Sequence, residues 1–291
     1  MSLKHVLWAW VETGPQMKLP CTSSLPALLF SGLVLVPSLN VSAQVAPAPS
    51  AYTPPAQIQP SATYGNQPIR SSDVPIGLFQ GQSDIGNTHL PGGALYDGTT
   101  KEYTVSSAGY NTVFIRDEFH YLWSKMSGDV SLAADIAFPD ADGYEGRKAV
   151  LVIRQSLDDD SQEAVVALYG NGSFRLGQRP GKGARRLDME YRVWSREGSG
   201  NPPARVSSVL MPQRIGLSKY GDVFILYVSM QGEPMHPFGE PFILHMNGPF
   251  YVGIGFCSNL KDKSDVAIFS HVVLEKPQPA APHRAAAAPT P

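Results

Sequence analysis

Cysteine is scarce in this chain of 291 residues, which contains only two. Cys21 lies in an N-terminal segment that we expect to be removed, so Cys257 would remain alone in the mature protein. A single cysteine excludes an intrachain disulfide, and the fold must then be held by its apolar core. Because Cys257 lies within an apolar stretch, we expect a buried and chemically inert thiol.

Excess charge and long apolar runs are also missing. The formal net charge is −2 and no long basic run occurs, which argues against nucleic acid and anionic membranes as partners. No stretch approaches the ~18 consecutive apolar residues that a membrane-spanning helix needs. We therefore expect no membrane span once the N-terminal segment is removed.

The motifs of common hydrolases are absent as well. There is no Gly-x-Ser-x-Gly elbow, no His-Glu-x-x-His zinc helix and no phosphate-binding loop. Sandwich enzymes of the laminarinase type carry Glu-x-Asp-x-x-Glu on one strand, whereas residues 188–193 read Asp-Met-Glu-Tyr-Arg-Val here. The sequence thus favours a protein without catalytic activity, and a glycoside hydrolase or lyase on the same fold is the alternative.

The N-terminus has the pattern of an export signal. Met17 and Lys18 supply a positively charged start, residues 25–36 (LPALLFSGLVLV) are apolar, and small residues follow at 41–43 (VSA). We expect cleavage after Ala43 and a periplasmic or secreted mature protein. An uncleaved N-terminal anchor is the alternative interpretation.

Composition divides the chain into four parts. Residues 1–43 are the predicted N-terminal extension and signal peptide. Residues 44–72 and 277–291 are rich in Pro and Ala and have few large apolar side chains, so we expect a disordered linker and a disordered tail. Residues 73–276 between them form one predicted domain.

Strands are predicted throughout this domain. Residues 130–138 (VSLAADIAF) place their large apolar side chains at every second position, the period of a strand with one buried face. Turn signals such as residues 127–129 (SGD) separate the strands, and no long amphipathic helix occurs. These features predict an all-β fold, a two-sheet antiparallel β-sandwich of the jelly-roll type. Further strands are predicted at 118–126, 149–153, 163–169, 223–230, 251–257 and 266–274.

Several short motifs are similar to those of a known family. They are residues 84–86 (DIG), 116–123 (RDEFHYLW), 126–129 (MSGD) and 154–161 (RQSLDDDS). Together they resemble a bacterial family of concanavalin A-like sandwich domains of the laminin-G or jelly-roll type, over most of 76–275. Some members stand beside β-propellers labelled as Tol-type biopolymer-transport proteins. The resemblance implies a sandwich fold and no settled activity.

The segment 116–123 concentrates side chains of functional type and distributes them over two faces of a strand. Its aromatic residues Phe119, Tyr121 and Trp123 suit either a core or a platform for a sugar ring. We expect them to be core, which assigns the opposite parity of the strand to a ligand on the concave sheet. The predicted ligand-binding residues are Glu118, His120, Ser124, Arg154, Tyr169, Arg175 and Gln178.

Arg154 is expected to be structural as well as close to any site. It follows the apolar run 150–153, so its guanidinium should lie against a sheet, where an unpaired charge is costly. A carboxylate from the segment 116–120, either Asp117 or Glu118, is the predicted partner.

Two loops have ion-binding potential. The acidic turn after Arg154 offers Asp158 and Asp160 as weak calcium candidates, although such turns are ordinarily solvated. We expect no resident cofactor. The basic loop at 178–186 (QRPGKGARR) would attract an anionic glycan or phosphate, or else is a solvated hairpin loop.

Two classes of partner remain for the predicted site. A glycan is suggested by analogy with other sandwiches of this fold, and another protein of the cell envelope is the alternative. Facing carboxylates in a deep groove would favour a hydrolase or lyase, whereas a flat apolar patch would favour a protein partner.

Overall fold

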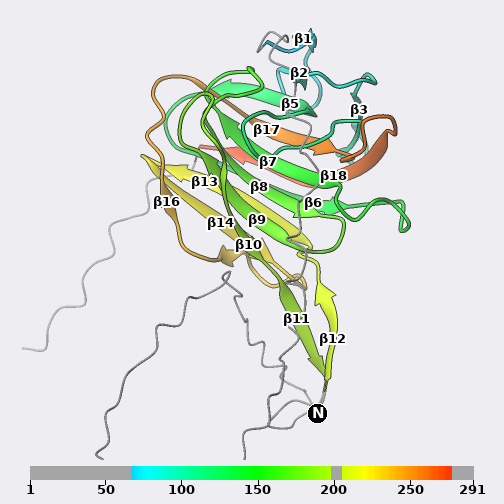
Figure 1. Cartoon of the computed structure of the whole chain (residues 1–291). Helices are drawn as coiled ribbons and strands as arrows, with labels where there is room; N and C mark the ends of the chain where they lie inside the picture. The colour runs from blue at the N-terminus through cyan, green and yellow to red at the C-terminus, as the bar shows by residue number, and fades with distance from the viewer. Residues whose placement is uncertain (1–66, 198–204, 277–291) are drawn as a thin grey trace, which may run out of the picture. The chain divides into compact units, whose positions relative to one another are not determined.

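A computed structural model describes residues 67–197 and 205–276 of the chain. Within these ranges all regular secondary structure is β-strand, arranged in two large sheets and one separate hairpin (Figure 1). The predicted all-β, two-sheet antiparallel sandwich is therefore confirmed. The predicted signal peptide, most of the predicted linker and the tail after 276 lie outside the described residues.

Sheet 1 contains eight strands, and each neighbouring pair is antiparallel. Its central strands β7 and β8 are buried at every position, as their continuous apolar runs indicate. In spatial order the strands are β1 (Arg70–Ser72), β2 (Gly81–Ile85), β5 (Phe119–Met126), β17 (Phe250–Cys257), β7 (Lys148–Arg154), β8 (Glu163–Tyr169), β9 (Phe174–Arg179) and β10 (Leu187–Tyr191).

Sheet 2 also contains eight strands, and a two-stranded hairpin is formed by β11 (Val193–Glu197) and β12 (Arg205–Leu210). The spatial order of sheet 2 is β15 (His236–Pro237), β14 (Val223–Ser229), β13 (Arg214–Tyr220), β6 (Val130–Ala137), β18 (Asp265–Glu275), β4 (Glu102–Ser107) and β3 (Gly93–Asp97), with β16 (Phe242–Ile243) paired to β14.

Glycines occupy turns between strands. Gly128, with φ 81°, lies in the connection from β5 of sheet 1 to β6 of sheet 2, and Gly172, with φ 82°, lies in the β8–β9 hairpin. Both values lie in the left-handed region, which glycine adopts without a steric penalty. The turn predicted at residues 127–129 is confirmed.

The main core lies between the two sheets. Leu122, Val166 and Ile254 of sheet 1 belong to the same buried apolar cluster as Leu132 and Leu217 of sheet 2. This packing of two inner faces is the general arrangement of a β-sandwich. Cys257 is buried, and its Sγ lies 3.2 Å from the carbonyl oxygen of Gly109, so the expected buried thiol is confirmed.

One predicted boundary needs correction. Strand β1 begins at Arg70, so ordered structure starts before residue 73, the predicted beginning of the domain. The physical reason is an ion pair, because the Arg70 guanidinium contacts the buried Asp84 carboxylate of β2. A segment of linker-like composition is thereby held against the sheet edge.

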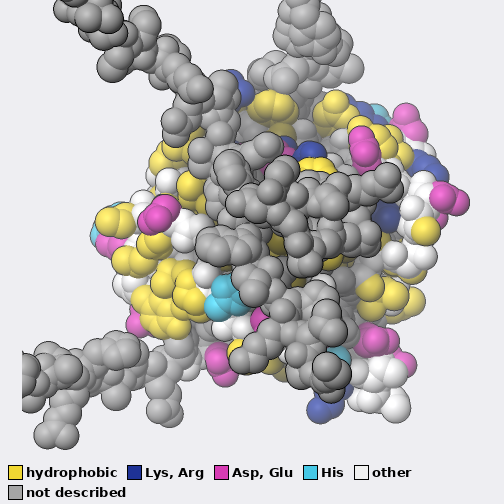
Figure 2. Space-filling view, turned by 90° about the horizontal axis from the view of Figure 1, so that it is seen from below, with side chains coloured by type: hydrophobic (Ala, Val, Ile, Leu, Met, Phe, Trp, Pro, Cys, Tyr) yellow, Lys and Arg dark blue, Asp and Glu magenta, His cyan; other side chains and the backbone are white. Residues whose placement is uncertain are grey.

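The described surface carries both signs of charge. Acidic, basic and apolar side chains are interspersed around the part of the face that is visible in Figure 2. No helix within the described ranges is long and apolar enough to cross a membrane.

Candidate functional site

The two faces of sheet 1 have different environments. Its inner face packs against sheet 2 and includes Leu122 of β5. Its outer face carries a second buried cluster that includes Phe119, Tyr121 and Trp123. These aromatics are buried in a core cluster, as expected, but this cluster is separate from the one that lies between the two sheets. Both faces of the central strands are apolar, so a period of two does not reveal which face meets the second sheet.

An ion-pair network lies at one end of the outer face. Asp117 accepts two hydrogen bonds from Arg179, at 2.8 Å to Oδ1 and 2.9 Å to Oδ2, and its Oδ2 also lies 3.4 Å from Arg154 Nη2. Glu163 contacts Arg179 at 3.3 Å, Arg154 at 3.6 Å and Arg186 at 3.7 Å. The expectation that a carboxylate from 116–120 meets Arg154 is confirmed, and that carboxylate is Asp117.

Strand register explains how these charges meet. Arg154 of β7 is directly opposite Glu163 of β8, which is opposite Arg179 of β9. Opposite residues on neighbouring strands point to the same face, so opposite charges lie in a row. The side chains of the five network residues are at most 2% exposed.

The two buried carboxylates of the network have opposite pKa shifts. Burial raises the pKa of Glu163 to about 7, and the charge of Asp117 adds to this rise although the arginines oppose it. Burial also acts to raise the pKa of Asp117, but the charge of Arg179 and its hydrogen bonds outweigh it, so the pKa of Asp117 is below its ordinary value. The network ties the segment before β5 to the central strands.

A second group of polar side chains lies farther along the outer face, around Tyr169. We call Lys148, Tyr169, Arg175 and Arg186 the Tyr169 cluster. The Tyr169 ring centroid lies 5.2 Å from Lys148 Nζ and 4.6 Å from Arg175 Cζ. Arg186 Nε donates to Asp188 Oδ1 at 2.9 Å, whereas both of its Nη atoms lack a hydrogen-bond partner.

Other polar atoms of the Tyr169 cluster are also buried without a hydrogen bond. They are the hydroxyl oxygen of Tyr169 and Nε of Arg175. Arg175 does contact Glu190 through Nη2, and Lys148 donates to the side-chain oxygen of Asn259. Buried polar groups in native proteins are nearly always paired, so these unpaired atoms are candidate contacts for a ligand.

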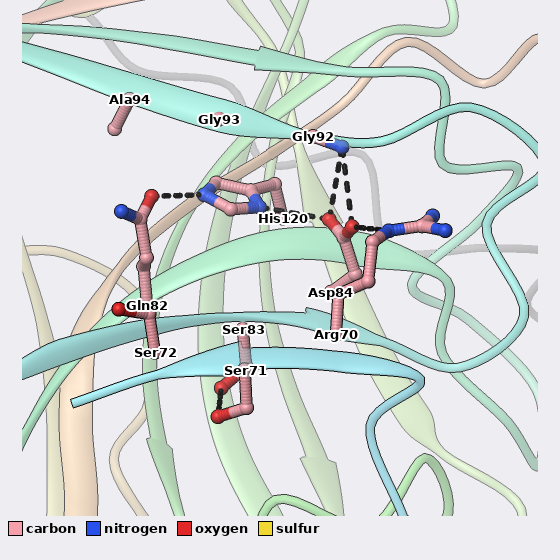
Figure 3. Close-up of a pocket in the computed structure, with 10 residues that line it drawn as sticks. All are labelled: Arg70, Ser71, Ser72, Gln82, Ser83, Asp84, Gly92, Gly93, Ala94 and His120. Atoms are coloured by element: carbon pink, nitrogen blue, oxygen red, sulfur yellow. Dashed lines mark hydrogen bonds and ion pairs between the residues drawn. The ribbon is translucent and has the colours of Figure 1, made fainter.

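A pocket around His120 lies at another place, at the edge of the sandwich (Figure 3). His120 Nδ1 lies 2.8 Å from Asp84 Oδ1, and Nε2 lies 3.0 Å from Gln82 Oε1. Asp84 also accepts a hydrogen bond from the Gly92 amide at 3.1 Å. The cavity measures about 270 Å³ and is lined by Arg70, Ser71, Ser72, Gln82, Ser83, Asp84, Gly92, Gly93, Ala94 and His120.

The polar groups of this pocket pair with one another. Burial alone would raise the pKa of Asp84, but hydrogen bonds from His120 and Arg70 keep it below its ordinary value. A Cβ atom on Gly92 would lie 2.5 Å from Asp84 Oδ1 and 2.6 Å from His120 Nδ1, so glycine permits the close approach of this loop. These hydrogen bonds connect β2, β5 and the segment before β3.

The predicted ligand-binding residues therefore do not form one site, because they lie on both faces of sheet 1. Arg154, Tyr169 and Arg175 share the outer face of sheet 1. His120 and Ser124 have the parity of Leu122, and the Ser124 hydroxyl donates to the carbonyl oxygen of Leu78 at 3.1 Å. The aromatics do form a buried cluster, but Glu118, His120 and Ser124 have the parity of the face that packs on sheet 2, so this parity is not a ligand face.

Glu118 and Gln178 also lie away from the Tyr169 cluster. Glu118 precedes β5 and is buried, and this burial raises its pKa. Gln178 is opposite Ala164, a residue of the main core, so it has the parity of the inner face.

The weak calcium candidates contact a lysine. Lys182 Nζ lies 2.5 Å from Asp158 Oδ2 and 2.6 Å from Asp160 Oδ1. Among residues 67–197 and 205–276, no group of three or more His, Cys, Asp or Glu side chains has the arrangement of a metal site.

Sequence reasoning missed two members of the Tyr169 cluster as site residues. Arg186 lies in the basic loop 178–186, so its charge was visible but its position over the sheet was not. Lys148 directly precedes an apolar run and looks like a strand boundary. Lys148 reaches the cluster because it is directly opposite Tyr169 on the neighbouring strand. This pairing cannot be predicted from the sequence of one strand.

Comparisons with known proteins return remote structural similarities. No family model matches the chain, and no curated protein matches it. A functionally unknown protein from Saccharomyces cerevisiae is 11% identical and has a TM-score of 0.44, covering 65% of this chain and 97% of that one. A carbohydrate-binding module from Bacillus subtilis is 13% identical with a TM-score of 0.39, covering 64% and 92%.

An alginate lyase from Klebsiella pneumoniae is also similar, at 10% identity and a TM-score of 0.38, covering 63% of this chain and 84% of that one. Nothing in these similarities supports the Tol-type label. At these identities and scores, the similar structures do not determine a function for this chain.

Proposed function

We propose that this chain is an exported, non-catalytic carbohydrate-binding sandwich that holds its ligand on the outer face of sheet 1, at Tyr169. The observation that carries the proposal is the set of unpaired polar atoms beside this aromatic ring, the Tyr169 hydroxyl and Arg175 Nε. A sugar offers apolar ring faces to an aromatic side chain and hydroxyl groups to polar side chains. The His120 pocket has the weaker claim, because its polar groups already pair with each other.

The position of Tyr169 suits a binding site. It lies at the end of β8, between β7 and β9 of the same sheet, and rigid strands hold side chains more accurately than loops do. Arg175 is 28% exposed at its side chain, whereas Tyr169, Lys148 and Arg186 are buried, so a ligand would reach the cluster past Arg175. Glycan binding at one such site is expected to be modest, with a Kd of about 10 μM to 1 mM.

Replacing Tyr169 by alanine is expected to weaken glycan binding by tenfold or more, because the change removes both the ring and the hydroxyl. Replacing His120 by alanine should change the affinity less than about twofold, since His120 lies in the other pocket. A glycan array identifies an oligosaccharide that the parent binds, and calorimetric titration then compares the parent with both variants.

Near-ultraviolet circular dichroism shows that each variant has kept its tertiary structure. If His120→Ala abolished glycan binding and Tyr169→Ala left it unchanged, the site would be the pocket of Figure 3. Release of shortened or unsaturated products by the parent would favour the hydrolase or lyase alternative. An array without any bound glycan would contradict the proposal.

Export is supported by the charged, apolar and small-residue order of residues 17–43. Mass spectrometry of the protein from its native host is expected to find a mature N-terminus at or near Gln44. A mature chain that still contains residues 25–36 would contradict this expectation.

A protein partner is supported by a different observation. Leu95 on the edge strand β3 is 75% exposed, and Leu187 on the edge strand β10 is 58% exposed. Exposed apolar residues on sheet edges invite pairing with another chain. An envelope protein is therefore the second candidate ligand, to be preferred if no glycan binds.

A further inference from the structure

We propose that the Tyr169 cluster binds an anionic group of the glycan, namely the carboxylate of a uronic acid or a sulfate ester. This inference rests on the proposed function and adds the chemical class of the ligand. It follows from the balance of charge in the cluster, from its unpaired donors and from the way Arg186 is held.

The cluster contains three cationic side chains, and only two carboxylates accept hydrogen bonds from them. Lys148 comes from β7, Arg175 from β9 and Arg186 from the loop before β10. The neighbouring carboxylates are Asp188, which accepts from Arg186 Nε, and Glu190, which accepts from Arg175 Nη2. Lys148 donates to a neutral amide. Arg186 also approaches Glu163, but at 3.7 Å and without a hydrogen bond.

The unpaired atoms are almost all donors. They are Arg186 Nη1 and Nη2, Arg175 Nε and the Tyr169 hydroxyl, and only the hydroxyl can also accept. A ligand that satisfies this set must therefore supply several acceptor oxygens. A carboxylate or sulfate supplies them and also offsets the excess positive charge, which a neutral sugar hydroxyl does not.

The Arg186 guanidinium lies close to the backbone of β9 at Gly177. A Cβ atom on Gly177 of β9 would lie 3.2 Å from Arg186 Nε and 2.4 Å from Asp188 Oδ1. The Arg186 side chain thus lies close over Gly177, across β9 on the outer face. Asp188 accepts from Nε, and Nη1 lies 3.7 Å from Glu163 Oε1, so Nη2 is the atom best placed for another acceptor.

The electrostatic environment of Tyr169 agrees with this geometry. Burial raises the pKa of Tyr169 to about 12, while the charges of Arg175 and Arg186 act to lower it. The hydroxyl therefore stays protonated at neutral pH and can donate to an anion. The side chains of Asp188 and Glu190, at 17% and 35% exposure, border the cluster on the β10 side.

The inference is tested by calorimetric titration of the full chain with matched oligosaccharides. We would use an oligogalacturonate, its methyl ester, a sulfated galactan oligosaccharide and a neutral galactan oligosaccharide of similar length. The expected result is that at least one anionic ligand binds tenfold or more tightly than its neutral counterpart and that added salt weakens this binding. The uronate and sulfate arms distinguish the two sources of negative charge.

Two variants connect the charge preference to the cluster. Arg175→Met should weaken anionic binding by about tenfold or more, whereas Arg192→Met is the matched control, because Arg192 contacts the same Glu190 and lies outside the cluster. Tyr169→Phe removes only the unpaired hydroxyl, so it should weaken anionic binding without lowering the melting temperature.

The outcomes separate this inference from the proposed function. Equal affinity for charged and neutral sugars, or equal effects of Arg175→Met and Arg192→Met, would overturn the anionic site while carbohydrate binding stands. If none of these ligands nor any glycan of the array binds the folded parent, both ideas fail. An anionic preference that Tyr169→Phe and Arg175→Met both reduce supports the inference.

Discussion

Replacing Arg154 by methionine is expected to lower the free energy of unfolding by about 3–5 kcal/mol, because removal of one partner leaves buried charge uncompensated. The side chain of Arg154 is fully buried and contacts both Asp117 and Glu163. It also donates to the carbonyl oxygens of Ser156 at 2.9 Å and Asp158 at 2.6 Å. The change therefore removes an ion pair and leaves two carbonyl groups without this donor. Chemical denaturation followed by fluorescence measures the loss.

The matched control is Arg214→Met on sheet 2. Arg214 forms an ion pair with Asp135 at 2.7 Å, but both side chains are about one-fifth exposed, at 20% and 22%. Exposed or partly exposed pairs contribute little, so a loss of at most about 1 kcal/mol is expected there. Equal, small losses for the two variants would show that the network around Asp117 does not stabilise the fold.

Replacing Glu163 by glutamine is expected to change stability in the opposite direction, and only above mildly acidic pH. The pKa of Glu163 is raised from 4.5 to about 7 in the folded protein, chiefly by burial. The fold thus favours the protonated form, and the parent loses stability as the pH rises from 4.5 to 7, with no further loss above that window. Glutamine resembles the protonated acid and does not ionise.

The variant should therefore match the parent near about pH 5 and exceed its free energy of unfolding by on the order of 3 kcal/mol near about pH 8. Denaturation curves at several pH values provide the measurement. Asp117 does not obscure it, because its pKa lies below the ordinary value of 3.8 and its stabilising effect is lost only as the pH falls below that range. A variant that is less stable than the parent at high pH would mean that ionised Glu163 strengthens the network.

The strands of the domain could be predicted because each carries a local signal. The alternation of 130–138 corresponds to β6, and the apolar run 163–169 corresponds to β8 with the same bounds. The pairing of Arg154 with a carboxylate from 116–120 was also predictable, since a guanidinium at the end of a buried strand needs an acceptor. The start of ordered structure was misplaced because Arg70 is held by residues that follow it in the sequence, Asp84 and Thr88, and its strand pairs with β2.

The sequence by itself determined the all-β architecture, the main turns and the need for a partner at Arg154, because periodicity and burial costs are local properties. Only the tertiary structure decided which face of β5 meets sheet 2, since both faces of sheet 1 are apolar. A period of two assigns residues to two faces but does not say which face packs against the other sheet. The tertiary structure also decided the candidate site, where Lys148, Tyr169 and Arg175 meet through the register of three strands and Arg186 reaches them across Gly177. Such proximity depends on pairing between distant segments, which no single stretch of sequence encodes.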